Sequence, residues 1–206
     1  MDILARKSLL GVAALLLSGC VSTPSTTYTP PALYPYSNTV TIGSSFDETW
    51  DNLVTYASKS FFAIDNFEKD SGLMTLSFSA SDAARYIDCG NIFVNSGRPF
   101  NGPYALYAQR YNGAGLTGII NLRVRTLTTD ETEVAVNARY IFTVPGSTIR
   151  VLSSVATIPA VTWTFDSKSS DTRYIANPAP GTPPTRSCVA TGAAETQILE
   201  GVQRPE

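Results

Sequence analysis

The residues of this chain that could carry chemistry are three cysteines and seventeen carboxylates, because the sequence contains no histidine. Histidine is the commonest general base near neutral pH, so its absence excludes Ser-His-Asp and Cys-His catalysis and histidine-based zinc sites. Hydrolysis by two carboxylates needs acids about 5–10 Å apart. Asp65, Asp70, Asp82 and Asp88 are near one another in sequence, but no pattern selects a pair. We therefore expect no enzyme activity, no metal and no cofactor.

The first cysteine follows a segment that has the three parts of an export signal. Arg6 and Lys7 precede a short apolar run, and Leu17-Ser18-Gly19-Cys20 ends it. The run is about half the roughly 20 residues that span a bilayer. Its last four residues resemble the bacterial lipobox, and this resemblance implies that residues 1–19 are a signal peptide and that Cys20 is lipidated. Several acyl chains anchor firmly, since each buried CH₂ contributes about 0.8 kcal/mol.

The residue after this cysteine bears on the membrane to which a lipoprotein would be sorted. Val21 stands where an Asp would favour retention in the inner membrane, so the sorting rule of enterobacterial lipoproteins favours the outer membrane, and we expect the domain on its periplasmic face. The alternative is a plain secretory signal with a chance cysteine.

The two remaining cysteines, Cys89 and Cys188, are expected to form a disulfide, because compartments outside the cytoplasm are oxidising. The alternative is a metal or redox pair. No C-x-x-C motif is present, and two thiols without histidine make a poor zinc site.

Residues 20–38 carry the expected lipid and then a segment dominated by Pro, Ser and Thr, which predicts a tether. Proline-rich chain extends by about 3.1 Å per residue, which would let the tether span about 50 Å. Tyr28, Tyr34 and Tyr36 lie in it. One interpretation makes them contacts for a partner or for the membrane interface. The other makes them incidental residues of a linker, and we favour this one.

Residues 39–206 predict a single α+β domain, with a curved antiparallel β-sheet packed against one long N-terminal helix and a short C-terminal helix. Ser45 and Glu48 form a capping box before a helix over about 46–60. Alternating apolar residues predict strands at 39–42, 61–68, 73–78, 120–125, 134–142 and 161–165. A second proline-rich link covers 177–187, and the short helix follows over about 191–202, with Thr191 as its cap.

Residues 90–115 are rich in Gly, Asn, Pro and Tyr and show no clear period, which predicts a long irregular segment. Long loops are often functional, so this is the candidate binding loop. Its candidate residues are Arg98, Tyr104, Tyr107, Arg110 and Tyr111.

Two resemblances extend this interpretation. The helix, strand and Lys69-Asp70-Ser71-Gly72-Leu73-Met74 turn resemble BamC-like domains, lipoproteins of the outer-membrane barrel assembly machinery in which a curved sheet grips a helix. Tyr86-Ile87-Asp88-Cys89-Gly90 and Cys188-Val189-Ala190-Thr191-Gly192, with Glu195, Ile198 and Leu199 after it, look like a family of uncharacterised proteobacterial lipoproteins. The first covers about 40 residues and implies a helix-grip fold. The second covers most of the chain beyond Cys20 and implies a disulfide frame.

The charge pattern limits the classes of partner that we expect this chain to bind. The formal net charge is −2 and no run of Lys and Arg occurs, so neither nucleic-acid binding nor a polybasic membrane segment is predicted. Arg123, Arg125 and Arg139 share the polar face of the 120–142 hairpin, either as an anion site or, as we favour, as a solvated face near Glu133.

We expect a non-catalytic lipoprotein, anchored at Cys20, that binds an envelope protein at the outer membrane. The alternative is a module that binds lipid or a small apolar ligand in a void lined by Trp50, Phe61 and Phe78. A carboxylate-based hydrolase acting on envelope polymers is a third hypothesis.

Overall fold

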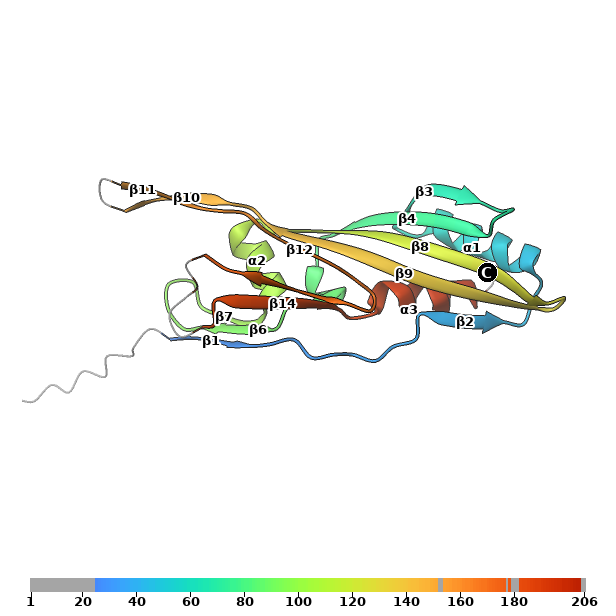
Figure 1. Cartoon of the computed structure of the whole chain (residues 1–206), viewed down its shortest axis with the longest axis horizontal. Helices are drawn as coiled ribbons and strands as arrows, with labels where there is room; N and C mark the ends of the chain where they lie inside the picture. The colour runs from blue at the N-terminus through green and yellow to red at the C-terminus, as the bar shows by residue number, and fades with distance from the viewer. Residues whose placement is uncertain (1–24, 152–153, 177, 179–181, 205–206) are drawn as a thin grey trace, which may run out of the picture.

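The protein is an elongated α+β molecule of mostly antiparallel strands in several sheets, with three α-helices in its described part (Figure 1). This computed structural model describes residues 25–151, 154–176, 178 and 182–204. The expected α+β class is confirmed. A single curved sheet was expected, and the strands instead form one large sheet and three small ones.

The largest sheet is built on one long hairpin, whose two strands run most of the length of the molecule (Figure 1). The strand order is β12-β9-β8-β4-β3, and β2 lies beside β9 on the same edge as β12. The strands are β2 (Thr39–Ile42), β3 (Ala63–Glu68), β4 (Leu73–Ala80), β8 (Gly115–Thr128), β9 (Glu131–Val144) and β12 (Val161–Asp166).

One face of this sheet is buried because its apolar residues alternate with polar ones, as the sequence predicts. Ile120, Leu122, Val134 and Val136 are at most 1% exposed. Helices α1 (Phe46–Lys59) and α3 (Ala193–Val202) cover that face. The opposite face is exposed to solvent. There an Arg125 guanidinium nitrogen lies 3.0 Å from a Glu133 carboxylate oxygen, as expected for a solvated face.

The two expected helices form, but α1 is shorter than expected and α3 starts later than expected. Ser45 caps α1 by accepting a hydrogen bond from the Glu48 backbone N–H at 3.4 Å. The helix has 14 residues and is not especially long. Helix α3 begins at Ala193 with Gly192 (φ +80°) as its N-cap, one residue after the predicted cap Thr191, whose hydroxyl accepts a hydrogen bond from the Ala193 backbone N–H at 3.3 Å.

Three small sheets complete the fold. The first has the order β1-β6-β7, the second β13-β14-β5, and the third is the projecting β10–β11 hairpin (Figure 1). Their strands are β1 (Thr26–Thr29), β5 (Ile87–Asp88), β6 (Asn91–Val94), β7 (Phe100–Pro103), β10 (Ser147–Val151), β11 (Ser154–Ile158), β13 (Ser170–Tyr174) and β14 (Thr185–Ala190). A 3₁₀ turn, Ala83–Arg85, precedes β5. The last residues of the predicted proline-rich link 177–187 thus belong to β14.

The prediction of an irregular segment at 90–115 is wrong. It contains the β6–β7 hairpin and a third helix, α2 (Tyr104–Asn112). Each strand has only four residues, which is too short for an alternation to stand out. Helix α2 ends at Gly113 in the left-handed conformation (φ +68°), a common helix stop.

The predicted free tether is also corrected for its described part. Residues 25–38, which we call the N-terminal arm, run along the domain (Figure 1), and β1 pairs with β6 over Thr26–Thr29. Cys20 and the expected signal peptide, 1–19, lie outside the described residues.

Candidate functional site

Tyr28 fixes the first half of the N-terminal arm. Its hydroxyl donates a hydrogen bond to the Cys89 carbonyl oxygen at 3.0 Å, and burial raises its pKa. The ring lies against Gly90, where a Cβ would come within 2.8 Å of it. Gly90 has φ +79°, so both its conformation and its contact favour glycine. This tyrosine, interpreted from sequence as incidental, is a structural contact.

Arg186 is the cation against which Tyr28 packs. Its guanidinium carbon is 4.0 Å from the Tyr28 ring centroid and 5.6 Å from that of Tyr104, so the cation lies between two aromatic rings. The side chain is 3% exposed, and burial lowers its pKa. It donates to the carbonyl oxygens of Pro183 and Thr185 at 2.6 and 2.9 Å. These neutral acceptors, with the rings, hold a buried cation that ties β14 to the arm.

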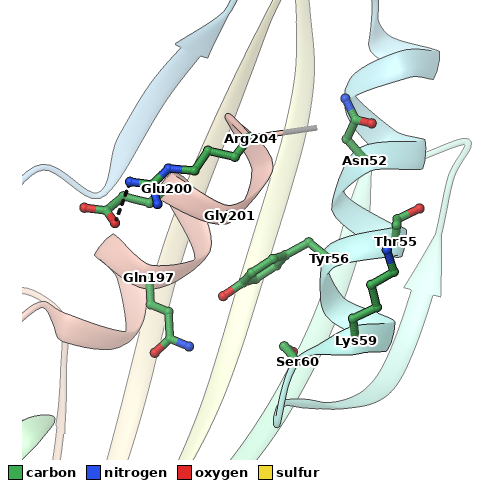
Figure 2. A pocket seen from close by; sticks show the side chains of 9 residues that line it. All are labelled: Asn52, Thr55, Tyr56, Lys59, Ser60, Gln197, Glu200, Gly201 and Arg204. Carbon is green, nitrogen blue, oxygen red and sulfur yellow. Dashed lines mark ion pairs between the residues drawn. The ribbon is translucent and has the colours of Figure 1, made fainter. Parts of the chain in front are cut away.

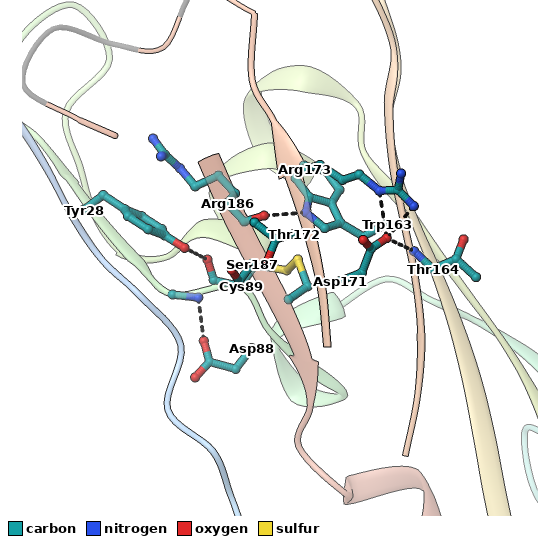
Figure 3. The surroundings of a disulfide bond; sticks show 12 residues. Tyr28, Asp88, Cys89, Trp163, Thr164, Asp171, Thr172, Arg173, Arg186 and Ser187 are labelled. Atoms are coloured by element: carbon teal, nitrogen blue, oxygen red, sulfur yellow. Dashed lines mark hydrogen bonds and ion pairs between the residues drawn. A yellow bond between two sulfur atoms is a disulfide. The ribbon is translucent and has the colours of Figure 1, made fainter. Parts of the chain in front are cut away.

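The disulfide between Cys89 and Cys188 lies beside this arginine (Figure 3). Both cysteines are fully buried, and the bond joins residues 99 positions apart. It fixes the end of β5 to β14, next to the Trp163 indole, which donates to the Arg186 carbonyl oxygen at 2.9 Å. The expected disulfide is therefore present, and it stabilises the region that receives the arm.

Tyr36 fixes the second half of the arm. Its hydroxyl donates to the Ser167 carbonyl oxygen at 2.7 Å and lies 3.2 Å from Oε1 of Glu195. Glu195, in the first turn of α3, is fully buried and accepts hydrogen bonds from Ser167 Oγ at 2.6 Å and from the Tyr140 hydroxyl at 2.8 Å. Burial and the neighbouring Glu195 carboxyl raise the pKa of Tyr140 well above its usual value. Three hydroxyls therefore surround one carboxyl group where arm, sheet and helix meet.

The residues of the predicted binding loop divide into two groups. Tyr104 is 7% exposed and packs on Trp163 in the core, so it is not available to a partner. Arg98 and Arg110 are exposed, and each guanidinium lies 5.6 Å from the Tyr111 ring centroid. Tyr107 lies 5.1 Å from Tyr111, centroid to centroid. The fold therefore brings four of the five predicted residues together on one surface.

Phe100 also belongs to this surface, although the sequence analysis did not select it as a candidate residue. Its ring is 5.4 Å from that of Tyr107 and 6.1 Å from that of Tyr111. Arg98, Phe100, Tyr107, Arg110 and Tyr111 are called the basic aromatic face below.

A groove separates α1 from α3 (Figure 2) and has a volume of about 580 Å³. Tyr56 forms its floor and lies on Gly201, where a Cβ would come within 2.2 Å of the ring. The Tyr56 hydroxyl is buried beside the Gln197 side chain, and burial raises the pKa of the hydroxyl. The groove is lined by Asn52, Thr55, Tyr56, Lys59, Ser60, Gln197, Glu200, Gly201 and Arg204. This lining is mostly polar, so the groove suits hydrogen-bonding groups.

The apolar void considered from sequence does not form as expected. Trp50 and Phe78 are 3% and 6% exposed and belong to the hydrophobic core, whereas Phe61 is 49% exposed. Phe61 and Phe78 are in edge-on contact, 5.9 Å between centroids. These rings pack against one another or face solvent.

Two of the four carboxylates considered for hydrolysis, Asp65 and Asp88, have structural partners. Asp65 accepts a hydrogen bond from Ser77 at 2.9 Å, and Asp88 accepts the backbone N–H groups of Gly90 and Ala32 at 2.7 and 3.3 Å. Within the described ranges, no group of three or more His, Cys, Asp or Glu side chains is placed to hold a metal ion. None of the helices in the described part of the chain has the length and apolar character needed to cross a membrane.

The chain matches no known family, no curated protein and no solved structure in the three comparisons made.

Sequence reasoning missed Arg186 and the role of Glu195. Arg186 stands beside Cys188 in a segment interpreted as a link, and nothing local marks it as buried. Glu195 lies in the first turn of its helix, where an acid is common for local electrostatic reasons and does not mark a buried site. The only signal for either was proximity to the second cysteine, which predicts an ordered environment.

Proposed function

We propose that this chain is a non-catalytic lipoprotein of the outer membrane, anchored through Cys20, that holds its domain in a set orientation and binds an envelope protein partner. The observation that carries the proposal is the bound N-terminal arm. Tyr28 and Tyr36 attach it at two sites, and β1 pairs with β6. A lipid at Cys20 would therefore act on one end of the molecule and not on a free tether.

The covalent length of the chain limits the distance to the anchor. Five residue steps separate Cys20 from Ser25, and extended chain covers at most about 3.3–3.6 Å per residue, or roughly 18 Å in total. Ser25 is held to Asn95, since its N–H donates to Asn95 Oδ1 at 2.7 Å. The β6–β7 end of the domain would therefore remain close to the membrane.

The groove between α1 and α3 supports the partner-binding role. It lies toward the other end of the molecule from β1 (Figure 1), so an anchored domain would present it away from the lipid. Its lining carries polar side chains, among them Asn52, Thr55 and Gln197, which can pair with the carbonyl, amide and carboxylate groups of a partner. Backbone and polar side chains of a protein offer such groups.

The first experiment tests the anchor. Substitution Cys20→Ala should block lipid attachment and removal of residues 1–19, because the thiol is the expected acceptor. Processing is followed by gel mobility and by mass spectrometry of the N-terminal peptide. If the variant matures to the wild-type size, the lipidation proposal is wrong.

The second experiment tests the partner. A photoreactive amino acid at Thr55, an exposed residue lining the groove, should crosslink in the cell to one protein in stoichiometric yield. Thr117, exposed on β8, is the matched control and should not capture it. Protein isolated from detergent-solubilised membranes without any crosslinked partner would contradict the binding role.

A further inference from the structure

Charged side chains are separated along the long axis of the molecule. At the end where β1 begins, the elements β1, β6, β7, α2, β10 and β11 contain no Asp or Glu (Figure 1). They and the β6–β7 turn carry Arg98, Arg110 and Arg150. The opposite end holds α1, the β3–β4 hairpin and the β8–β9 turn. There nine acidic residues outnumber four basic ones, Lys59, Lys69, Arg123 and Arg125, so this end has an excess of negative charge. The acids are Asp47, Glu48, Asp51, Asp65, Glu68, Asp70, Asp130, Glu131 and Glu133.

The acids nearest the basic end are engaged in contacts. Asp171 pairs with Arg173 at 2.7 Å and also accepts the Thr164 backbone N–H at 2.8 Å. Asp88 accepts the Gly90 backbone N–H. The cations of the basic aromatic face thus have no carboxylate on their own elements.

The basic aromatic face combines two side-chain types that suit a membrane surface. Arg98 and Arg110 are exposed beside the half-buried ring of Tyr111. A guanidinium binds phosphate through two parallel hydrogen bonds. Tyrosine and phenylalanine supply apolar rings at head-group depth, and tyrosine is enriched at membrane–water interfaces. Phe93 on β6 and Val155 on β11 are 41% and 63% exposed and add apolar surface at this end.

We propose that the basic aromatic face lies on the phosphate head groups of the membrane that holds the anchor. This rests on the proposed lipidation of Cys20. The arm ends beside this face: the Asn95 backbone N–H donates to the Ser25 carbonyl oxygen at 3.2 Å, and Arg98 is three positions farther along the same turn. Because Cys20 can lie at most roughly 18 Å from Ser25, this turn is next to the lipid. The acidic elements at the opposite end are not.

The basic end and the acidic end of the molecule favour the same orientation on an anionic membrane. Anionic phosphates attract Arg98 and Arg110 and repel the carboxylates of the β8–β9 turn, so both ends favour one orientation. The sequence contains no basic run because the three arginines come from a turn, a helix and a strand that only the fold brings to one end.

The test measures which end approaches the head groups. The lipidated chain is reconstituted into vesicles of phosphatidylethanolamine and phosphatidylglycerol, with a nitroxide on the head groups. A fluorophore is placed by Ser96→Cys, in the β6–β7 turn, or by Thr129→Cys, in the β8–β9 turn. Both positions are exposed, and Cys89 and Cys188 are oxidised, so the new thiol is selective. We expect strong quenching at position 96 and none at position 129.

Substituting both Arg98→Ser and Arg110→Ser should reduce the quenching at position 96 to the level that the chain tether alone gives, whereas the charge-matched pair Arg123→Ser and Arg139→Ser, on the outer sheet face, should leave it intact. Raising the ionic strength to about 1 M, where the Debye length is about 3 Å, should weaken it as well. Equal quenching at both positions, or quenching insensitive to Arg98 and Arg110, overturns the proposal.

Mass spectrometry of the N-terminal peptide from the same preparation reports acylation of Cys20 separately. A lipidated chain without selective quenching overturns the orientation and leaves the anchor standing. A chain without acyl groups overturns the anchor, and sedimentation of that chain with the same vesicles then decides whether Arg98 and Arg110 bind phosphate on their own.

Discussion

The hydroxyl of Tyr36 lies 3.2 Å from Oε1 of Glu195, a carboxyl group 159 positions away that is fully buried in the first turn of α3. Ser167 and Tyr140 donate to the same carboxyl. The contact joins the N-terminal arm to the core, so the arm and the domain should gain and lose stability together.

Glu195→Ala should lower the free energy of unfolding by about 1–3 kcal/mol, since it removes the acceptor of the buried Tyr140 hydroxyl, whereas Tyr36 keeps the Ser167 carbonyl oxygen. Urea unfolding followed by circular dichroism measures it. Glu200→Ala, exposed on the same helix, is the control and should change stability by under about 0.5 kcal/mol. Equal effects of the two substitutions would show that the hydroxyl cluster is not stabilising.

Gly192→Ala should displace the arm. The backbone there has φ +80°, and the added Cβ would lie 2.4 Å from the Tyr36 ring. Gly97→Ala is a matched control, since Gly97 has φ +70° and no atom within 4 Å of the added Cβ. Left-handed strain, about 1–2 kcal/mol, applies to both.

Only Gly192→Ala adds the clash, so it should cost more than Gly97→Ala by about 1 kcal/mol or more and should speed hydrogen exchange in β1 and β2. The Tyr36→Ala background should remove most of that difference. If the difference between the two glycine substitutions persists there, the arm contact is not its cause.

Replacing Cys89 and Cys188 together by Ala should reduce the free energy of unfolding by about 2–4 kcal/mol, because the bond closes a long loop, and the chain-entropy value of roughly 4.7 kcal/mol is an upper bound. The oxidised protein from the cell envelope should contain no reactive thiol after unfolding without reductant. Two free thiols in such material would show that the bond does not form in the cell.

The protein should lose stability as the pH rises from 10 to 12. Burial raises the pKa of Tyr104 from 10.0 to about 12. A group whose pKa is raised by folding stabilises the fold below its unfolded pKa, and that contribution is lost as pH rises through the folded value. For Tyr104 the contribution is about 2–3 kcal/mol.

Tyr104→Phe should flatten this part of the stability–pH curve, since no proton remains to be lost at that position. Tyr174→Phe, at a residue that is 68% exposed, should leave the slope unchanged. Urea midpoints at a series of pH values test both. An unchanged slope in the Tyr104 variant would refute the assignment.

The fold was predictable where the sequence signal is local. Capping by Ser45 and alternation over β8 and β9 depend on residues a few positions apart, and both are confirmed. The hairpins at 63–80 and 115–144 follow from the same periodicity. The four-residue strands β6 and β7 were missed, because a short alternation among glycines and asparagines resembles a loop.

The candidate surface was predicted in part. Arg98, Tyr107, Arg110 and Tyr111 were chosen as residues of one irregular loop, and the structure brings them together through a turn and a helix. Phe100 lay in the same segment without a pattern to mark it. The groove on Tyr56 was not predicted, because it exists only where α1 meets α3, two helices that lie far apart in the sequence.

By itself the sequence determined the cap of α1, the long hairpins, the α+β class and the pairing of Cys89 with Cys188. Only the tertiary structure decided that the arm binds along the domain, that Arg186 and Glu195 are buried, and that three separate arginines share one end. The physical reason is range: caps and periodicity are set by neighbours along the chain, whereas burial of a polar side chain depends on partners supplied by distant segments, such as Tyr28 for Arg186 and Tyr36 for Glu195.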